Sequence, residues 1–394
     1  MLPAELAPAS VFRLTSELAL GTGDPNFRRL LERIDQSPFL PGNAVSLYFE
    51  GREAFAAMHR AIDEAQREVL CESFILRDDA TGQAFAEVLV RAAGRGVAVR
   101  LLVDGFGSSF TSRAFWRALR AQGIEVRVHP LPRRSRDHRK ILVVDQQVAF
   151  TGGMNIGQEY ATSGFTAAFR DTHARLHGPT AWEMAIVFSE GWIAAGGASF
   201  PIRDLGDEPA MAGAEVLVLD SRPLRGHGET ASVYAAILGA ARESVLVTNA
   251  YFAPRAIAVD LLGDAAKRGA DVRLLVPGPT NHSLVRHAGH GFFADLLARG
   301  VRVFEYQQGV LHAKTLVADG LVSVVGSTNL DFLSFRWNAE CNWVVVDPVV
   351  GGDLALAFAR DLDRSVEVTP ELWAGRSVAH RIGDALARRL APIL

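Results

Sequence analysis

Two short stretches of the chain carry side chains that could act on a phosphate ester. One reads HRKILVVD and contains His138 and Lys140, and the other reads HAKTLVAD and contains His312 and Lys314. Alternate side chains of a β-strand lie on one face, so each histidine is expected beside its lysine. An imidazole can attack a phosphorus atom or transfer a proton, and an ammonium group can bind phosphate oxygens. The sequence therefore predicts two matching sets of groups suited to chemistry at phosphorus.

Each set continues in the same order along the chain. An aspartate follows the apolar stretch, and a turn of small residues, TGGMN or VGSTN, comes later. Such a turn allows backbone N–H groups and an asparagine amide to approach an anion. A constant separation over many positions indicates an internal duplication. The further pairs, all 174 positions apart, are Asp145 and Asp319, Gly152 and Gly326, Gly153 and Ser327, and Asn155 and Asn329.

The segments around these residues also occur twice. Residues 85–103 resemble residues 258–276, and residues 115–130 resemble residues 292–307. Each segment has the pattern of an amphipathic helix, a glycine that ends it, and a strand. Strands and helices in alternation indicate an α/β sandwich in each half. We predict two similar α/β lobes related by a pseudo-two-fold axis, with one active site at their interface.

The predicted organisation has five parts. The linker is placed where glycine, proline and charged residues accumulate, and the ends lie outside the repeat. The parts are an N-terminal extension (1–44), a first lobe (45–200), a linker (201–215), a second lobe (216–365) and a C-terminal amphipathic helix (366–394).

The composition excludes several classes of protein. Hydrophobic residues make up 49% of the 394 residues, which is typical of a globular protein with a large core. The formal net charge of −3 gives no general reason to expect nucleic acid as a partner. No stretch is apolar for long enough to span a bilayer, and we expect no signal peptide. Cys71 and Cys341 lie in apolar stretches and are expected to be buried thiols, as suits a reducing compartment.

Two sets that face each other would supply every group that displacement at phosphorus requires. One neutral histidine would attack and form a phosphohistidine, and the other would protonate the leaving oxygen. The lysines and asparagines would carry the charge on the non-bridging oxygens, a task that metal ions perform elsewhere. We therefore expect neither a metal nor another cofactor.

The doubled pattern of histidine, lysine, aspartate, glycine and asparagine resembles the phospholipase D superfamily and, more narrowly, bacterial cardiolipin synthases. The resemblance covers about residues 45–394. It implies that His138 is the nucleophile and His312 the acid–base partner, although the reverse assignment stays open. It also implies that Lys140, Lys314, Asn155 and Asn329 hold the phosphate, and that Glu340, in NAECN, lies near the second motif.

Other residues receive a less definite interpretation. Asp145 and Asp319 fall on the opposite strand face from the histidines, so they are structural or orient a histidine of the other half. Asp171 is left without a role. The chain departs from the family pattern at Gly153, where the second motif has Ser327; at Leu333, where arginine is usual; and at Ala250, where proline is usual.

The resemblance implies transfer of a phosphatidyl group from phosphatidylglycerol to a second phosphatidylglycerol. The alternatives are a hydrolase of phospholipid or nucleic-acid phosphodiesters and a lipid-binding scaffold without activity. The expected partner is anionic phospholipid at a membrane surface, with no nucleic acid and no obligate protein partner. We expect a peripheral enzyme at the cytoplasmic face of the cell membrane.

Three further features could bind ligands. The basic run PRRSRDHRK (132–140) could contact anionic headgroups or be a solvated loop. His282, His287 and His290 match no standard set of metal ligands, so we expect them to be ordinary helix or loop residues. In the C-terminal helix, apolar residues recur every four positions among arginines, and we expect this helix to dock on the protein's own core rather than on a membrane. Its apolar residues are Val378, Ile382, Leu386 and Leu390.

Overall fold

The computed structural model describes residues 7–129, 135–161, 168–203, 212–222, 227–280 and 282–391. Its strands are β1 (Leu40–Tyr48), β2 (Glu68–Ser73), β3 (Ala98–Asp104), β4 (Glu125–His129), β5 (Lys140–Val144), β6 (Val148–Gly152), β7 (His173–His177), β8 (Ala214–Ser221), β9 (Ser244–Asn249), β10 (Asp271–Pro277), β11 (Arg302–Tyr306), β12 (Lys314–Ala318), β13 (Val322–Gly326), β14 (Glu340–Val346) and β15 (Ser365–Val368).

The helices lie between these strands and at both ends of the chain. They are α1 (Pro8–Glu17), α2 (Pro25–Asp35), α3 (Gly51–Glu64), α4 (Ala80–Gly94), α5 (Arg113–Ala121), α6 (Gln158–Ala161), α7 (Thr180–Ala194), α8 (His227–Ala240), α9 (Ala256–Lys267), α10 (Ser283–Ala298), α11 (Phe332–Arg336), α12 (Pro348–Leu362), α13 (Pro370–Ala374) and α14 (Val378–Arg388).

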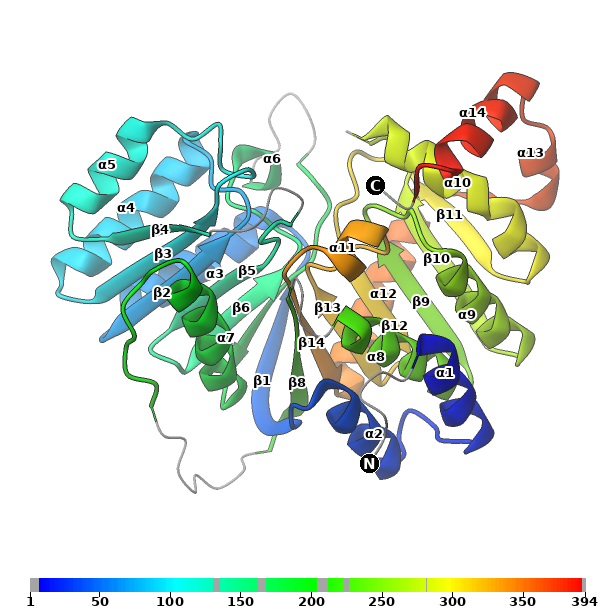
Figure 1. Cartoon of the computed structure of the whole chain (residues 1–394), viewed down its shortest axis with the longest axis horizontal. Coiled ribbons are helices and arrows are strands. Elements are labelled where there is room, and N and C mark those ends of the chain that lie inside the picture. Colours follow the sequence, from blue (N-terminus) through cyan, green and yellow to red (C-terminus); the bar gives the residue numbers. More distant parts are fainter. Residues whose placement is uncertain are drawn as a thin grey trace.

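The strands of the described residues form one continuous sheet in which two halves have the same topology. The first half has the order β4-β3-β2-β5-β6-β7-β1, and the second has β11-β10-β9-β12-β13-β14-β8, with β15 added at its outer edge. The halves meet where β1 pairs antiparallel with β8 (Figure 1). The predicted duplicated α/β fold is confirmed.

Glycines end the repeated helices, as the sequence predicts. Gly96 and Gly123 in the first lobe, and Gly269 and Gly300 in the second, have φ between 82° and 105°. Each lies just after a helix and before a strand, where a left-handed residue reverses the chain. A glycine adopts this conformation without the steric cost of a side chain.

Apolar side chains on the two faces of the sheet build separate cores. One core joins the lobes, since it contains α7 of the first lobe, the first turns of α12 and strand residues from both halves. A second core lies under α3, α4 and α5, and a third under α1 and α8–α10. Because both faces are covered, the central strands read as nearly continuous apolar runs. Cys71 and Cys341 are buried free thiols in these strands.

Two backbone contacts join the lobes beside the histidines. His138 N donates to Ala339 O of the second lobe at 2.9 Å, and Ala339 N donates to Arg136 O at 2.8 Å. On the other side of the pseudo-two-fold axis, His312 N donates to Arg170 O of the first lobe at 2.7 Å. Each histidine is therefore held against the lobe to which it does not belong.

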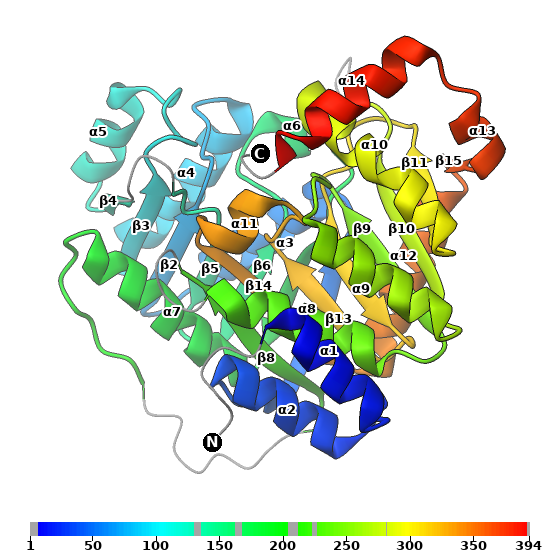
Figure 2. The ribbon, with the colours of Figure 1, turned by 45° about the vertical axis from the view of Figure 1, so that its right-hand side comes forward.

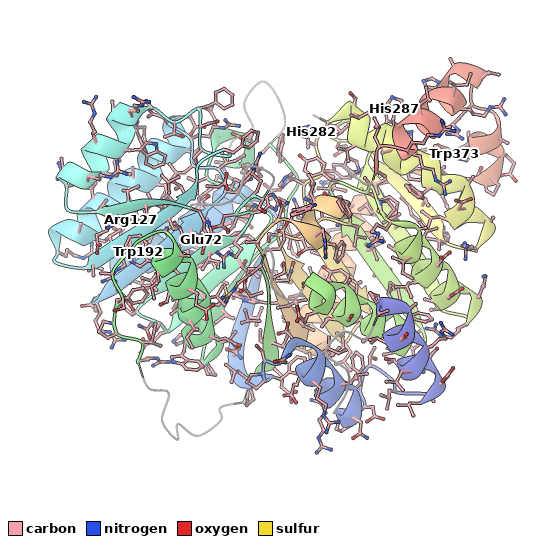
Figure 3. The ribbon with its side chains drawn as sticks, in the orientation of Figure 1. Glu72, Arg127, Trp192, His282, His287 and Trp373 are labelled. Atoms are coloured by element: carbon pink, nitrogen blue, oxygen red, sulfur yellow. The ribbon has the colours of Figure 1, made fainter. Side chains whose placement is uncertain are left out.

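Arg139, between His138 and Lys140, is a buried cation that also ties the lobes together. Its guanidinium lies 2.8 Å from Glu72 Oε1, 3.0 Å from Asp137 Oδ1 and 3.3 Å from Asp220 Oδ1, and Asp220 belongs to β8. Figure 3 labels Glu72 in the interior of the first lobe. Burial raises the pKa of Asp220 to about 6 despite the nearby guanidinium. Without Arg139, three carboxylates would share a buried space.

Replacing Arg139 is expected to destabilise the fold. Arg139→Ala should lower the free energy of unfolding by about 3–5 kcal/mol at neutral pH, because it leaves buried carboxylates without a counter-charge. The loss should shrink on acidification, since burial raises the pKa of Glu72 and of Asp220 and both then become neutral. Urea denaturation at two pH values measures both effects. Arg273→Ala, which removes an exposed ion pair with Asp271, is the control, and an equal loss in both variants would contradict this account.

The terminal helices pack on the second lobe. Figure 2 shows α1 and α2 against α8, and α13 and α14 against α10. The predicted linker falls largely on residues 204–211, outside the described residues, and the predicted domain boundaries stay a proposal. In the described part of the chain, no helix is long and apolar enough to cross a membrane.

Helix α14 faces the protein with the side opposite to the one that we expected. Its inner side carries Asp384 and Ala387, which are buried, while the row of apolar residues faces outward. Val378, Ile382 and Leu386 are 63%, 56% and 58% exposed. The expectation that this apolar row covers the protein's own core is wrong, because an ionic cluster around Asp384 holds the helix instead.

Candidate active site

His138 is oriented by a carboxylate of the other lobe. The side chain lies just before β5, is buried, and packs edge-on against Phe74 with 4.9 Å between ring centroids. Its Nδ1 lies 3.0 and 3.1 Å from the two oxygens of Glu340, at the start of β14. Ser327 Oγ donates to Glu340 Oε2 at 2.5 Å. The structure thus brings together three of the predicted residues, His138, Ser327 and Glu340.

His312 has the mirror arrangement with a residue that the sequence left without a role. Its Nδ1 lies 2.7 Å from Asp171 Oδ2, and Asp171 precedes β7 of the first lobe. Thr172 N donates to the other oxygen of Asp171 at 2.7 Å. The rings of Tyr160 and Tyr251 stand edge-on to the imidazole, with centroids 5.4 and 5.6 Å away. Asp171 is therefore the residue that sequence reasoning missed.

Asp171 and Glu340 occupy equivalent places in the two lobes. Gly153 N donates to the carbonyl of the residue after Asp171 at 2.9 Å, and Ser327 N donates to the carbonyl of the residue after Glu340 at 3.1 Å. A Cβ atom on Gly153 would overlap the Asp171 carboxylate. Steric crowding thus explains why the first motif has Gly153 where the second has Ser327. In the first lobe the Asp171 carboxylate occupies the place of a side chain on residue 153, whereas in the second lobe Glu340 leaves room for the serine hydroxyl.

The two lysines show that the two sets lie close together. Lys140 Nζ donates to His138 O at 2.6 Å, and Lys314 Nζ lies 2.8 Å from His312 Nδ1. Burial lowers the pKa of Lys140 to about 7 and that of Lys314 to about 8. Lys314 also lowers the pKa of His138, and Lys140 that of His312. Charges of the two lobes are therefore close enough to act on each other.

Both imidazoles are held neutral between a carboxylate and a lysine. Burial lowers the pKa of His138, and burial together with Lys314 lowers the pKa of His312 to about 3. Burial alone would raise the pKa of Glu340 and of Asp171, but the adjacent imidazoles and lysines hold both below their ordinary values. A proton on Nδ1 can be donated to the carboxylate, which leaves a lone pair on Nε2. Such an imidazole is suited to attack or to accept a proton.

The two asparagines differ in their hydrogen-bond partners. Asn155 Nδ2 donates to the hydroxyl of Tyr160 at 2.7 Å, and its Oδ1 accepts from Ile75 N at 3.3 Å. Asn329 is buried, and no described residue bonds its Oδ1. A buried amide with an unused oxygen is costly unless it serves a function. Among the described residues, Asn329 Oδ1 is therefore left with the capacity to accept a hydrogen bond from a ligand.

Gly152 and Gly326 are explained by strand packing. A Cβ atom on Gly152 would lie 2.7 Å from His173 Cα in β7, and one on Gly326 would lie 2.5 Å from Asn342 Cα in β14. Both approaches are too close for a side chain. These glycines allow β6 and β13 to pass near the strands that carry the carboxylates, and no contact assigns them to an anion.

Asp145 and Asp319 do not join the pocket. Asp145 accepts backbone N–H bonds from residues 66–68 at 2.8–2.9 Å, and Asp319 accepts equivalent bonds from residues 242–244 at 2.8–3.1 Å. Both lie at the far end of a five-residue strand from their lysine, roughly 16 Å away. Of the two roles expected for these aspartates, the contacts fit the structural one: they bind a hairpin to the start of the neighbouring strand. The carboxylates at the histidines are instead Glu340 and Asp171.

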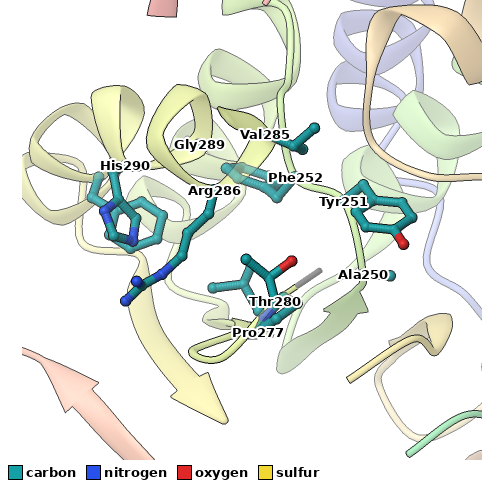
Figure 4. Close-up of a pocket in the computed structure, with 11 residues that line it drawn as sticks. Ala250, Tyr251, Phe252, Pro277, Thr280, Val285, Arg286, Gly289 and His290 are labelled. Atoms are coloured by element: carbon teal, nitrogen blue, oxygen red, sulfur yellow. The ribbon is translucent and has the colours of Figure 1, made fainter. Parts of the chain in front are cut away.

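A small pocket lies beside Tyr251, at the carboxyl ends of β9 and β10. Figure 4 shows Tyr251 at one end and Arg286 and His290 at the other. Its volume of about 20 Å³ is enough for one water molecule and too small for a lipid headgroup. Its place next to His312 does not make it a substrate site.

The histidines of α10 connect this helix to α14 and to β11. His287 Nδ1 lies 2.8 Å from Asp384 Oδ1, and His290 Nε2 lies 2.9 Å from Glu305 Oε1. Among the described residues, His287, His290 and Asp384 form the one group whose geometry could hold a metal ion, but Arg376 already pairs with Asp384. Figure 3 labels His287 where α10 meets α14. Residues 132–134 of the basic run lie outside the described residues.

Binding of an anion should depend on pH through the lysines. As the pH rises through about 7 and then 8, Lys140 and Lys314 lose their charge in the free protein. The dissociation constant of sulfate, which does not titrate in this range, should rise by about 100-fold or more from about pH 6 to about pH 9. Isothermal titration measures it. Lys140→Arg, which stays charged, should remove the part of the rise near pH 7, and a constant affinity in the parent would contradict the assignment.

Comparisons with known proteins place these features in a family context. The family described as "Cardiolipin synthase, PLD-like domain" matches residues 58–177 and 234–364. Cardiolipin synthase of Listeria monocytogenes is 31% identical over 389 residues, covering 94% of this chain and 81% of that protein. Cardiolipin synthase A of Pseudomonas aeruginosa is 34% identical over 375 residues, covering 93% of this chain and 76% of that protein.

A solved structure has the same fold at low sequence identity. The phosphatidylserine synthase of Haemophilus influenzae Rd KW20 superposes with a TM-score of 0.73 at 14% identity, over 93% of this chain and 98% of that one. At this identity the likeness concerns the fold alone.

Proposed function

The chain belongs to the cardiolipin synthase family of phospholipase D-like proteins, and from this premise we propose that it transfers a phosphatidyl group between two molecules of phosphatidylglycerol. The observation that carries the proposal is the pair of neutral imidazoles, each held through Nδ1 by a carboxylate of the opposite lobe. This arrangement directs Nδ1 of each ring to a carboxylate, so that the Nε2 atoms can act at one phosphorus centre; Lys314 Nζ also lies 3.2 Å from His312 Nε2.

The reaction needs one attacking and one proton-transferring histidine. His312 first takes up a proton when the anionic substrate binds. His138 Nε2 then attacks the phosphorus, the bond to the glycerol headgroup breaks, and His312 donates that proton to the departing oxygen. The hydroxyl of a second phosphatidylglycerol then gives its proton to His312 and attacks, which breaks the phosphorus–nitrogen bond. The products are cardiolipin and glycerol, and both histidines return to their starting state.

Binding of the anionic substrate should change the protonation states of His312 and the two lysines. In the free protein, burial keeps His312 neutral and lowers the pKa of both lysines. A phosphodiester placed between them adds negative charge, which raises the pKa of each neighbouring base. The lysines then bind the non-bridging oxygens as cations, and the imidazole that acts as acid can hold its proton. The Nδ2 amide groups of Asn155 and Asn329 would complete the set of donors.

The test is a lipid assay without added metal. Purified protein is incubated with phosphatidylglycerol vesicles in the presence of EDTA, and the lipids are followed by mass spectrometry. Cardiolipin and glycerol in equal amounts would support the transferase. Phosphatidic acid in place of cardiolipin would overturn it in favour of a hydrolase, and no change in the lipids would overturn a phospholipid substrate.

We further propose that the enzyme works as a peripheral protein at the inner face of the cell membrane, with α14 as the contact. The outward row of Val378, Ile382 and Leu386 is an exposed apolar surface, and Arg381 and Arg389 lie on the same helix. A helix with an apolar row and arginines is suited to an anionic bilayer surface. Figure 1 shows α14 at the upper edge of the second lobe and α6, the short helix that follows the first asparagine turn, at the upper edge of the first lobe.

A charge on this row should weaken membrane binding. Ile382→Glu combined with Leu386→Glu should lower the partition coefficient between vesicles and water by at least about tenfold. The reason is that two apolar side chains no longer enter the membrane interface. Sedimentation with vesicles that contain phosphatidylglycerol measures it. Leu356→Glu is a matched control, since Leu356 on α12 is also 58% exposed. Unchanged binding of the double variant would contradict α14 as the contact.

A further inference from the structure

A large cavity, partly open to solvent, lies between the second lobe and the ends of α1 and α2, next to the proposed active site. Its volume is about 1050 Å³, at the upper end of what small-molecule sites enclose. Strands β9 and β12 form its floor, and α8, α9 and α11 form its walls, with the ends of α1 and α2 at the far side. Figure 2 shows these helices grouped on one side of the second lobe. The catalytic steps described above use none of this space.

The cavity begins at the residues that would bind the phosphate. Leu316 in its floor follows Lys314 by two positions on β12, so both side chains lie on the same face of the strand. Leu330 and Asp331 in its wall directly follow Asn329. Asp331 is close enough to Lys314 for the two charges to interact. A molecule whose phosphate lies between the lysines can therefore extend directly into this space.

The lining selects an elongated apolar ligand. Residues of α8 from Gly228 to Leu238 contribute to the wall, which corresponds to about 15 Å along the helix. The side chains that face the space are mainly aliphatic or aromatic, among them Val247, Leu262 and Phe335. Arginines are few, and they include Arg33 and Arg255. Ligand sites are concave and mostly apolar, so this lining is typical of a binding site.

We propose that this cavity holds one acyl chain of the phospholipid whose phosphate reacts. The inference rests on the proposed function for the identity of the ligand. It adds that the enzyme draws one chain of its donor lipid out of the bilayer and along β12 toward α1 and α2. Recognition then depends on chain length as well as on the headgroup.

The experiment measures binding, not turnover, so that it stands apart from the test of the transferase. The probes are lysophosphatidylglycerols, which carry a single acyl chain, in a series of increasing length below their micelle concentrations. Their dissociation constants are determined by isothermal titration with the parent protein. Each added methylene should lower the constant by about fourfold, and the effect should stop at the length that fills the cavity.

Two variants of α9 distinguish binding in the cavity from binding elsewhere on the surface. Ala258 is half-buried and lines the cavity, so Ala258→Trp should fill it and end the gain at a shorter chain. Ala256 is exposed on the same helix outside the lining, so Ala256→Trp should behave like the parent. The same dependence on chain length in all three proteins would overturn the proposal. A loss confined to Ala258→Trp would support it even if the lipid assay showed no cardiolipin.

Discussion

His138→Ala should lower kcat for phosphatidyl transfer by at least about 10⁴-fold, and His312→Ala should do the same. Each variant removes one of the two bases that share a single phosphorus centre, and groups that act as a unit cannot replace each other. The double variant should therefore be hardly worse than either single variant. The measurement is cardiolipin formed per enzyme under saturating phosphatidylglycerol.

The control for this pair is an exposed histidine. His177→Ala removes an exposed imidazole at the far end of β7 from Asp171 and should keep full activity. Two independent sites, one per lobe, would instead leave about half the activity in each single variant. That outcome would contradict a single site at the interface.

Glu340→Gln should lower kcat by about 10²- to 10⁴-fold while changing KM little. The amide keeps the size of the side chain but removes the charge that fixes the proton on His138 Nδ1 and stabilises the imidazolium. Asp171→Asn should act in the same way through His312. Glu340 and Asp171 are positioning residues, so the pH profile of kcat should shift in both variants.

Ser327→Ala provides the comparison for Glu340. It removes one hydrogen bond to the carboxylate but leaves the charge beside His138, so the loss should be only severalfold. Equal losses in Ser327→Ala and Glu340→Gln would indicate a packing effect rather than a role for the charge. An unchanged pH profile in Glu340→Gln would contradict the orientation of His138 by this carboxylate.

The duplicated fold could be predicted because the repeated residues occur at a constant spacing along the sequence. The position of Asp171 could not be found in this way. Asp171 and Glu340 are separated by 169 positions, not 174, because the first lobe has a longer segment before β7. One signal was present: each carboxylate precedes a proline by eight positions, Asp171 before Pro179 and Glu340 before Pro348.

Contacts between the lobes could not be predicted from local sequence patterns. Glu340 lies 202 positions from His138, and only the folded chain shows that the carboxylate of one lobe serves the histidine of the other. The same holds for Arg139, which in sequence is one more cation of a basic run and in the structure is a buried link to Asp220. The direction of α14 is a further case, since periodicity identifies its apolar row but not what covers it.

The central claim is a covalent phosphatidyl group on one of the two histidines, and a rapid-quench experiment tests it directly. His312→Ala is mixed with phosphatidylglycerol and digested at alkaline pH, where phosphohistidine is stable, and peptides with His138 and residue 312 are examined by mass spectrometry. The account predicts a phosphatidyl adduct on His138 that the parent releases to a second phosphatidylglycerol. Cardiolipin formation by the parent with no adduct on either histidine in any variant would contradict it.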